Sequence, residues 1–588
     1  MKIICTNNHS AAKPYSPLPL GNGDLSLMID YTGNTTTKFY CNNHIQTGIW
    51  RAGYRLDNAQ SELVSFGHFE HVLPANAMEK EWTQRLNLDF PSVKCRCTYD
   101  NGVTVETEAY CLLNYNLVVI HKHVIGEAPL KVRYHFKPRR TTTVALDNER
   151  TEYEIDSWKP IRGMVAFFSK DEGMMASRSG DDILLRSNSD RGVFYLAFDE
   201  DALKFAKEHT EDEIASEHTA AWTAFWREST VPVDRLPKKH LQTARTAEYH
   251  LRLSSTNWSI PTGVYPTHWR GLYFAFDEFF PLMGLLASGH VSLACKIPRF
   301  RFSMLDAARQ RAYRYFGDGN SSLPARFVWE ASEEPGRECA VSGFWLEHIF
   351  HHANIALGAW YCYKANHDIE FLRDIAYPLM SSCAEFFRIF CVCEKEPGRF
   401  IIGKCTDLER LGAARENPFM TTCGAIATFR AAAEAAEMLG KDEGLQAQWR
   451  LMDEKLTETL PQNEFAYIPY PGCQDKSIAL LSGVFPYGNL QKDDAKSRKA
   501  INDFCACESQ FGNMYPVGKS LCTWYAGWKA LTFIRLGEIE IAKKVIDEMV
   551  EDTGNFSEVF EIAETGNHPW FTTGEGCLLQ AICEAYRQ

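Results

Sequence analysis

From about Lys238 to the end of the chain, apolar residues recur at helical spacing in one segment after another, with polar connections between the segments. Examples are FWLEHIFHHANIALGAWYCY, TTCGAIATFRAAAEAAEML and SLCTWYAGWKALTFIRL. Apolar residues at i, i+3, i+4 and i+7 predict amphipathic helices. Eleven such segments are clear, and a weaker one near 475–482 would supply a twelfth helix. Twelve helices in consecutive antiparallel pairs can close into an (α/α)6 barrel. No tight fixed-period repeat is found, which disfavours an open solenoid.

The first 210 residues follow a different pattern. Short runs rich in β-branched and aromatic residues, such as VTVETEAYCLL and VFYLAF, alternate with turn signals such as TGN, DNG and SDRG. Many short strands at modest spacing predict an antiparallel sandwich. We therefore expect a multidomain protein of α and β class, in which an N-terminal antiparallel β-sandwich (1–210) and a helical linker (211–237) precede a C-terminal (α/α)6 barrel (238–588).

Composition narrows the class of partner. The net charge of −13 would repel a phosphate backbone, so we expect no nucleic-acid partner. The apolar runs are too short for a bilayer span or a signal peptide, which predicts a cytoplasmic protein with no membrane partner. The 19 cysteines are scattered, mostly in apolar segments, and are expected to be reduced and buried. We expect no metal and no cofactor, and the sequence leaves a homodimer open.

Two long acidic loops in the helical half are candidates for chemistry. TDLERLGAARENPFMTT carries Asp407 and Glu409, and NFSEVFEIAETGNHPWFTT carries Glu558 and Glu561. Two carboxylic groups on opposite sides of a glycosidic bond are what an inverting glycosidase needs, one to protonate the leaving oxygen and one to activate water. Each carboxylate alone is also explained as a solvated loop charge or a helix cap.

Two further segments could bind a sugar. GVYPTHWRGLYFAFDEFF contains Trp269, Arg270 and Asp277, and RFVWEASEEPGRE contains Trp329 and Glu330. Aromatic rings beside carboxylates suit the apolar faces and hydroxyl edges of sugars. The alternative for both segments is helix packing with acidic caps.

These segments, in this order, resemble glycoside hydrolase family 65, which includes maltose, trehalose and kojibiose phosphorylases and related α-glucoside hydrolases. The similarity covers roughly residues 260 to 588, and it implies that Glu409 is the general acid. NFSEVFE resembles the segment that carries the general base in the glucoamylases of family 15, which implies this role for Glu558. A lysine-bearing family motif is replaced here by 475–478, where Lys476 is expected to bind sugar.

The N-terminal segments LPLGNGDLSLMIDYTG and CNNHIQTGIW are similar to the sandwich domain of glycoside hydrolase family 95, the α-L-fucosidases and galactosidases. The asparagine-bearing catalytic segment of that family is not found, so this resemblance ranks below that to family 65.

The expected function is an inverting glycoside hydrolase that releases a monosaccharide from an oligosaccharide or glycoside substrate, in first place an α-glucoside. A basic glutamate favours hydrolysis over phosphorolysis, because the phosphorylases use phosphate as the nucleophile. The alternatives are a disaccharide phosphorylase, an α-L-fucosidase-like or galactosidase-like hydrolase, and a non-catalytic sugar-binding protein. Glu561 remains an alternative base. A sugar epimerase on the same toroid would use histidines, for which the candidates are His268, His290, His348, His351 and His352.

Overall fold

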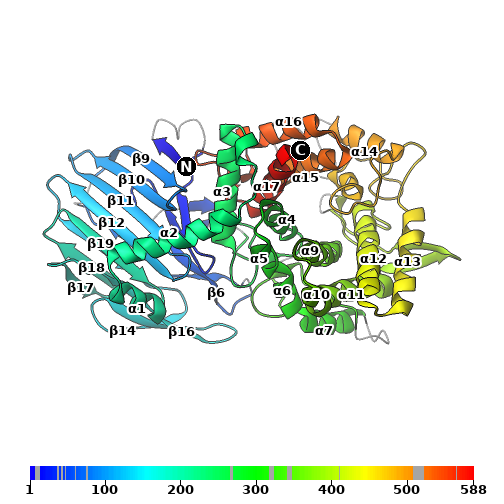
Figure 1. Cartoon of the computed structure of the whole chain (residues 1–588). Coiled ribbons are helices and arrows are strands. Elements are labelled where there is room, and N and C mark those ends of the chain that lie inside the picture. The colour runs from blue at the N-terminus through cyan, green and yellow to red at the C-terminus, as the bar shows by residue number, and fades with distance from the viewer. Residues whose placement is uncertain are drawn as a thin grey trace.

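The computed structural model describes most of the chain, with both a β-sheet half and a helical half (Figure 1). The described residues are 1–6, 14–35, 39–41, 44–46, 48–59, 61–73, 77–264, 269–316, 323–340, 347–408, 411–506, 522–563 and 566–587. Within these ranges, no helix is both long enough and apolar enough to cross a lipid bilayer.

The N-terminal half is a sandwich of antiparallel sheets, as the sequence predicts. A nine-stranded sheet has the order β1-β9-β10-β11-β12-β19-β16-β15-β14, and two four-stranded sheets have the orders β17-β18-β13-β8 and β2-β3-β6-β7. The strands of the large sheet are β1 (Lys2–Thr6), β9 (Glu79–Asn87), β10 (Ser92–Tyr99), β11 (Thr104–Cys111), β12 (Leu117–Ile125), β14 (Thr141–Ala145), β15 (Arg150–Ile155), β16 (Ile161–Phe168) and β19 (Arg191–Ala197). The small sheets contain β2 (Leu18–Gly21), β3 (Leu25–Ile29), β6 (Ile49–Arg55), β7 (Leu63–Ser65), β8 (His68–His71), β13 (Leu130–His135), β17 (Met175–Ser179) and β18 (Asp182–Ser187), and β4 (Phe39–Cys41) pairs with β5 (His44–Gln46).

Alternating side chains explain why these segments form half-buried strands. In β10, Val93, Cys95 and Cys97 are buried, whereas Lys94 and Arg96 between them are exposed. Successive side chains of a strand point to opposite faces, so one face of β10 joins the core of the sandwich and the other meets solvent.

Helices α1 (Glu200–Glu208), α2 (Glu211–Glu228) and α3 (Lys238–Ser254) connect the two halves, with the short 3-10 helix η1 (Val233–Arg235) before α3. Thr210 and Glu213 form a capping box that starts α2. Trp222 of α2 and Tyr249 of α3 are buried in the same apolar cluster as the sandwich strands. The two helices therefore pack on the sandwich: α2 runs across its strands, and α3 stands between the sandwich and the helical half (Figure 1).

The helical half is an (α/α)6 barrel. Its inner ring runs α4 (Phe279–Ser288), α9 (His351–Asn366), α12 (Phe419–Leu439), η5 (Ile478–Gly483), α15 (Thr523–Leu536) and α17 (Thr572–Arg587), and each of these contacts the next, with α17 returning to α4. Around them lie α3, α5 (Val291–Ala294), α6 (Lys296–Ser303), α7 (Leu305–Phe316), α10 (Ile369–Phe371), α11 (Tyr377–Phe386), α13 (Glu443–Glu458), α14 (Ala495–Cys505) and α16 (Ile539–Glu551), together with the π-helical turns η2 (Leu372–Ala376) and η3 (Phe387–Cys391).

The inner helices are buried on every side. In α12, all residues from Phe419 to Phe429 are buried, which is the pattern of a helix that is surrounded by others. The segment near 475–482 forms only the short 3-10 helix η5, which closes the ring between α12 and α15. Among the described residues of the helical half, short strands form three two-stranded sheets. β20 (Tyr273–Phe274) pairs with β21 (Glu330–Ala331), β22 (Val392–Glu396) with β23 (Arg399–Ile402), and β24 (Phe560–Ile562) with β25 (Asn567–Pro569).

Candidate active site

The loops that lead into the inner elements are bonded to one another at one rim of the barrel. Thr573, at the start of α17, donates a 2.9 Å hydrogen bond to Asp277, which comes just before α4. Thr523, at the start of α15, donates a 2.6 Å hydrogen bond to the carbonyl of Phe560 in β24. Side chains from distant parts of the sequence therefore meet at the N-terminal ends of the inner helices, where the helix dipoles favour anionic groups.

The segments around Arg270 and Glu330 come together through a short antiparallel pairing. Phe274 of β20 lies opposite Glu330 of β21. The guanidinium of Arg270 donates a 2.6 Å hydrogen bond to Glu330 Oε2, and Arg270 has a left-handed backbone with φ of 58°. Glu338 accepts the backbone N–H groups of Trp329 and Glu330 at 2.9 and 3.0 Å and so holds β21 in place. The structure brings together these two residues that the sequence predicts.

Asp277 and Glu330 are acids whose protonation is shifted toward neutral pH. Burial raises the pKa of Asp277 to about 7, and the carboxylates of Glu561 and Glu278 add to that rise. Burial likewise raises the pKa of Glu330 to about 7, helped by Glu338 and Asp277 and opposed by Arg270. A carboxyl group that is partly protonated near pH 7 can both donate and accept hydrogen bonds, which suits a sugar hydroxyl.

The hairpin of β24 and β25 carries Glu561 next to this pair. Glu561 Oε2 and His568 Nδ1 are joined by a hydrogen bond, and both side chains keep some exposure, 16% and 12%. His568 and Trp570 have φ of 53° and 57°, a left-handed conformation that is costly for such side chains. The ring of Trp269 packs against His568 with centroids 5.0 Å apart and so supports the hairpin from the side of Arg270.

Glu558 has different surroundings, although it lies only three residues before Glu561. Its side chain is enclosed, with the residue only 1% exposed, and its Oε2 accepts the backbone N–H of Phe556 at 2.8 Å. Burial raises its pKa, whereas the backbone N–H of Phe556, the nearby His250 of α3 and a hydrogen bond from the Ser16 hydroxyl oppose this rise. The carboxylate therefore faces the packing between the sandwich and the barrel.

Glu409 lies outside the described residues, but the chain just before it is placed. Thr406 forms a parallel bridge with His348 and donates a 2.8 Å hydrogen bond to Glu347. The ring of His348 packs on Trp329 with centroids 4.4 Å apart, so the loop that leads to Glu409 belongs to the same rim.

Asp407, two residues before Glu409, is fully buried at the start of α12. It accepts hydrogen bonds from the backbone N–H and the hydroxyl of Thr421 at 2.9 and 2.6 Å. Burial raises its pKa to about 6. Asp407 thus anchors the loop to the inner ring.

The other predicted residues have different positions. Trp329 is 3% exposed and Trp269 8% exposed, so both rings are mostly covered by protein. Lys476 pairs with Asp503 of the outer helix α14 at 3.5 Å. Of the histidines that the sequence offered for an epimerase, His268 lies outside the described residues, and His290, His348, His351 and His352 are fully buried.

Two residues that the sequence analysis did not single out also belong to this rim. Trp524, in the first turn of α15, is only partly buried and lies 5.7 Å from Phe276, centroid to centroid. Arg55 of β6 donates hydrogen bonds to the carbonyls of Arg270 (3.0 Å) and Gly271 (2.6 Å) and is paired with Glu333 at 2.5 Å. The signal in the sequence was the pair of arginines, Arg51 and Arg55, in the short segment IWRAGYR, since a buried charge needs a partner.

Known proteins resemble this chain in both sequence and fold. The family model of the glycosyl hydrolase family 95 catalytic domain matches residues 327–584. A kojibiose hydrolase from Mucilaginibacter mallensis is 26% identical over 392 residues, which cover 64% of this chain and 54% of that protein. A kojibiose phosphorylase from Thermoanaerobacter brockii is 22% identical over 317 residues, which cover 50% of this chain and 40% of that protein. The chain thus matches about half the length of these relatives.

Two solved structures share the architecture over nearly the whole chain. One, described as a kojibiose phosphorylase from the human microbiome, has a TM-score of 0.69 at 10% identity and covers 98% of this chain and 88% of that one. A bacterial glucoamylase in complex with acarbose has a TM-score of 0.62 at 10% identity and covers 100% of this chain and 97% of that one. At this identity the likeness establishes the fold, a β-sandwich followed by an (α/α)6 barrel.

Proposed function

We propose that this chain, which resembles the six-hairpin glycosidases in fold and in sequence, is a glycoside hydrolase that cleaves an α-glucoside such as kojibiose with inversion. The observation that carries the proposal is the set of carboxylic groups at the barrel rim, Asp277, Glu330 and Glu561, two of them with a pKa raised to about 7. Acid and base catalysis on a glycosidic bond needs carboxyl groups in both protonation states.

The charge of this rim favours water over phosphate as the nucleophile. Arg270 is the cation next to these acids, and it is already paired with Glu330 at 2.6 Å. A phosphate dianion would have to approach several carboxyl groups, of which Asp277 is partly ionised near pH 7, whereas water carries no charge. This supports hydrolysis, although a phosphorylase is among the sequence relatives.

Glu409 is assigned as the general acid. The assignment rests on the family resemblance and on the loop before it, which Asp407 and Thr406 fix at the same rim as Trp329. Glu409 would protonate the glycosidic oxygen.

Glu561 is assigned as the general base in preference to Glu558. A base must be ionised and must reach the water that it activates. Burial holds the pKa of Glu558 above its ordinary value, and its carboxylate is enclosed. Glu561 is partly exposed, interacts with Asp277 and is oriented by His568. The motif resemblance favours Glu558, so the two residues are tested side by side.

Substrate binding is assigned to Asp277, Glu330 and Arg270, which would bond sugar hydroxyls. Trp524 is the more accessible aromatic platform, because the rings of Trp269 and Trp329 are covered. In this account Trp269 positions His568 and the hairpin. Lys476, paired with Asp503, would reach a sugar only by leaving that partner.

The test is an assay of kojibiose cleavage with and without phosphate, applied to the wild type and to Glu561→Gln and Glu558→Gln. We expect glucose release without phosphate and a fall in kcat of about 10² or more in Glu561→Gln. For Glu558→Gln we expect a kcat within about tenfold of the wild type, because the amide keeps the enclosed shape. Loss of activity in Glu558→Gln alone would return the base to Glu558.

A second candidate is an α-L-fucoside or galactoside hydrolase. It is favoured by the family 95 catalytic-domain match over residues 327–584. The same assay distinguishes the two candidate functions if it includes aryl α-L-fucosides and galactosides. Cleavage of these compounds, without cleavage of α-glucosides, would show that the glycone is fucose or galactose instead of glucose. An epimerase is disfavoured because burial lowers the pKa of His348 to about 3 and keeps its ring from a substrate.

A further inference from the structure

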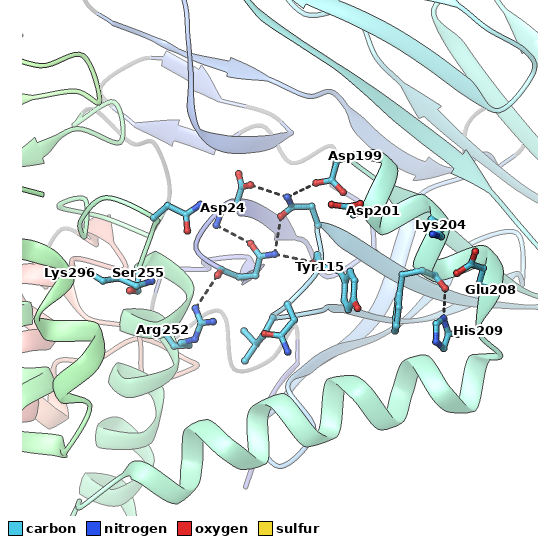
Figure 2. Close-up of a pocket in the computed structure, with 16 residues that line it drawn as sticks. Asp24, Tyr115, Asp199, Asp201, Lys204, Glu208, His209, Arg252, Ser255 and Lys296 are labelled. Carbon is cyan, nitrogen blue, oxygen red and sulfur yellow. Dashed lines mark hydrogen bonds between the residues drawn. The ribbon is translucent and has the colours of Figure 1, made fainter. Parts of the chain in front are cut away.

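A cavity lies between the sandwich and the barrel, apart from the rim (Figure 2). Its volume is about 640 Å³, within the range of small-molecule sites. Loops of the sandwich, helix α1, the end of α3 and the start of α6 line it. Asp277, Glu330 and Glu561 are not among its lining residues.

One end of the cavity is basic. Arg252, in the last turn of α3, and Lys296, at the start of α6, both line it, and Figure 2 places them on the same side. Burial lowers the pKa of each side chain, and the pKa of Lys296 is lowered further by Arg252, which is close by. Within the described part of the chain, neither cation forms an ion pair; their partners are the carbonyls of Asn22 (3.0 Å) and Thr256 (3.3 Å).

A buried hydroxyl lies at the same end. Ser255 lines the cavity, is 3% exposed, and its Oγ has no hydrogen-bond partner among the residues that the structure describes. A buried hydroxyl without a partner costs free energy. Two cations that form no ion pair with a described residue, and one hydroxyl without a described partner, are the groups that bind an oxyanion.

Two of the four acids that line the cavity, Asp24 and Asp199, are already paired with other groups. Asp24 accepts hydrogen bonds from Arg51 at 2.7 Å and from Asn116 at 2.9 Å. Asp199 accepts one from Asn116 at 2.7 Å and caps α1. These carboxylates therefore do not neutralise Arg252 and Lys296.

The opposite end of the cavity is aromatic and polar. Tyr115 and Phe205 stack with centroids 3.9 Å apart, and Phe205 stacks on His209 at 4.2 Å. The exposed carboxylates of Asp201 and Glu208 stand beside these rings (Figure 2). The aromatic rings suit the apolar C–H groups of a ligand, and the carboxylates can accept hydrogen bonds from its hydroxyl groups.

We infer that this cavity binds a small polyhydroxylated anion, such as a sugar phosphate or a sugar acid. Its oxyanion group would sit between Arg252, Lys296 and Ser255, and its hydroxylated body would lie along the wall formed by Tyr115 and Phe205. The site is separate from the proposed catalytic rim and does not depend on the reaction assigned there.

The test is calorimetric titration of the full chain with glucose 6-phosphate, gluconate, glucose and inorganic phosphate. We expect one equivalent of glucose 6-phosphate or gluconate to bind, and glucose or inorganic phosphate to bind at least about tenfold more weakly, a difference of about 1.4 kcal/mol. Binding of glucose 6-phosphate alone would show that the site prefers a phosphate group, and binding of gluconate alone would show that it prefers a carboxylate. Failure of both to bind, or equal binding of glucose or of inorganic phosphate, would overturn the inference.

Three variants and two controls locate the binding. Lys296→Gln and Arg252→Gln should each raise Kd about tenfold or more, and Ser255→Ala, which removes no charge, about threefold or more. Lys544→Gln, the same charge change on exposed α16, should bind as the wild type does, and so should Glu561→Gln at the rim. Wild-type affinity in folded Lys296→Gln and Ser255→Ala would place the anion elsewhere and refute the site. Loss in Glu561→Gln would mean that the anion binds at the rim.

Discussion

Replacing Arg55 by Met tests how the sandwich holds the sugar-binding loop of the barrel. Arg55 is 2% exposed, and its guanidinium pairs with Glu333 and donates to the carbonyls of Arg270 and Gly271. Met keeps much of the volume but leaves the Glu333 carboxylate buried. Among the described residues, its remaining side-chain donor is then the hydroxyl of Tyr273 at 2.9 Å. The substitution therefore removes a charge partner without creating a large cavity.

The expected cost follows from this burial. The side chains of Arg55 and Glu333 are 3% and 4% exposed, so the pair has little solvent screening. Breaking a buried ion pair costs about 3–5 kcal/mol. For a large domain this lowers Tm by about 2 °C per kcal/mol, or about 6–10 °C. The KM for substrate should also rise, because the backbone of Arg270 loses its support.

Scanning calorimetry of three variants checks the reasoning. Arg162→Met breaks a surface ion pair with Glu154, in which the Arg162 side chain is 79% exposed and the Glu154 side chain 48%. This substitution should lower the free energy of unfolding by less than about 1 kcal/mol. Arg55→Met combined with Glu333→Leu removes both charges and should recover part of the stability that Arg55→Met loses. A Tm for Arg55→Met within 2 °C of the wild type, or a double variant less stable than the single one, would refute the buried-pair argument.

Three further predictions concern the rim. Burial raises the pKa of Asp277 from 3.8 to about 7, so the stability from its bound proton is present below about pH 4 and is lost as the pH rises to about 7. The Tm of Asp277→Asn minus that of the wild type should therefore increase as the pH rises from 4 to 7. A Tm difference that does not change over this pH range would contradict the raised pKa. Trp524→Ala should raise KM about two- to tenfold with little change in kcat, and an unchanged KM would remove Trp524 from the sugar site. His568→Gln should lower kcat more than it raises KM, because His568 orients Glu561. If steady-state kinetics show a larger change in KM than in kcat, His568 is a binding residue instead.

The sequence predicts the architecture well where its periodicity is strong. Alternation in β10 and the continuous apolar character of α12 identify a strand and an inner helix without further information. The closure of the ring through the short η5 could not be predicted, because six residues carry too little periodicity to distinguish a helix from a loop. The last sandwich strand ends at Ala197, and the segment up to 208 is helix α1, since charged and apolar residues in that segment follow helical spacing.

The candidate site is predictable in part. Arg270, Asp277 and Glu330 stand out as polar residues on loops before inner helices, and the structure brings them together. The choice between Glu558 and Glu561 depends on the turn at Ser557, whose φ of 63° directs the following side chains. A sequence pattern does not reveal such a turn when the residue is not glycine. Arg55 belongs to another domain, and only tertiary packing connects it to the loop.

The measurement that tests the proposed function most directly is proton NMR of kojibiose incubated with the protein in phosphate-free buffer. The account predicts that glucose appears without phosphate and that the newly released glycone is first the β-anomer, because water attacks the α-glucoside from the opposite face. Absence of turnover until phosphate is added, with release of a sugar 1-phosphate, would contradict hydrolysis. Release of the α-anomer first would contradict inversion and the paired roles of Glu409 and Glu561.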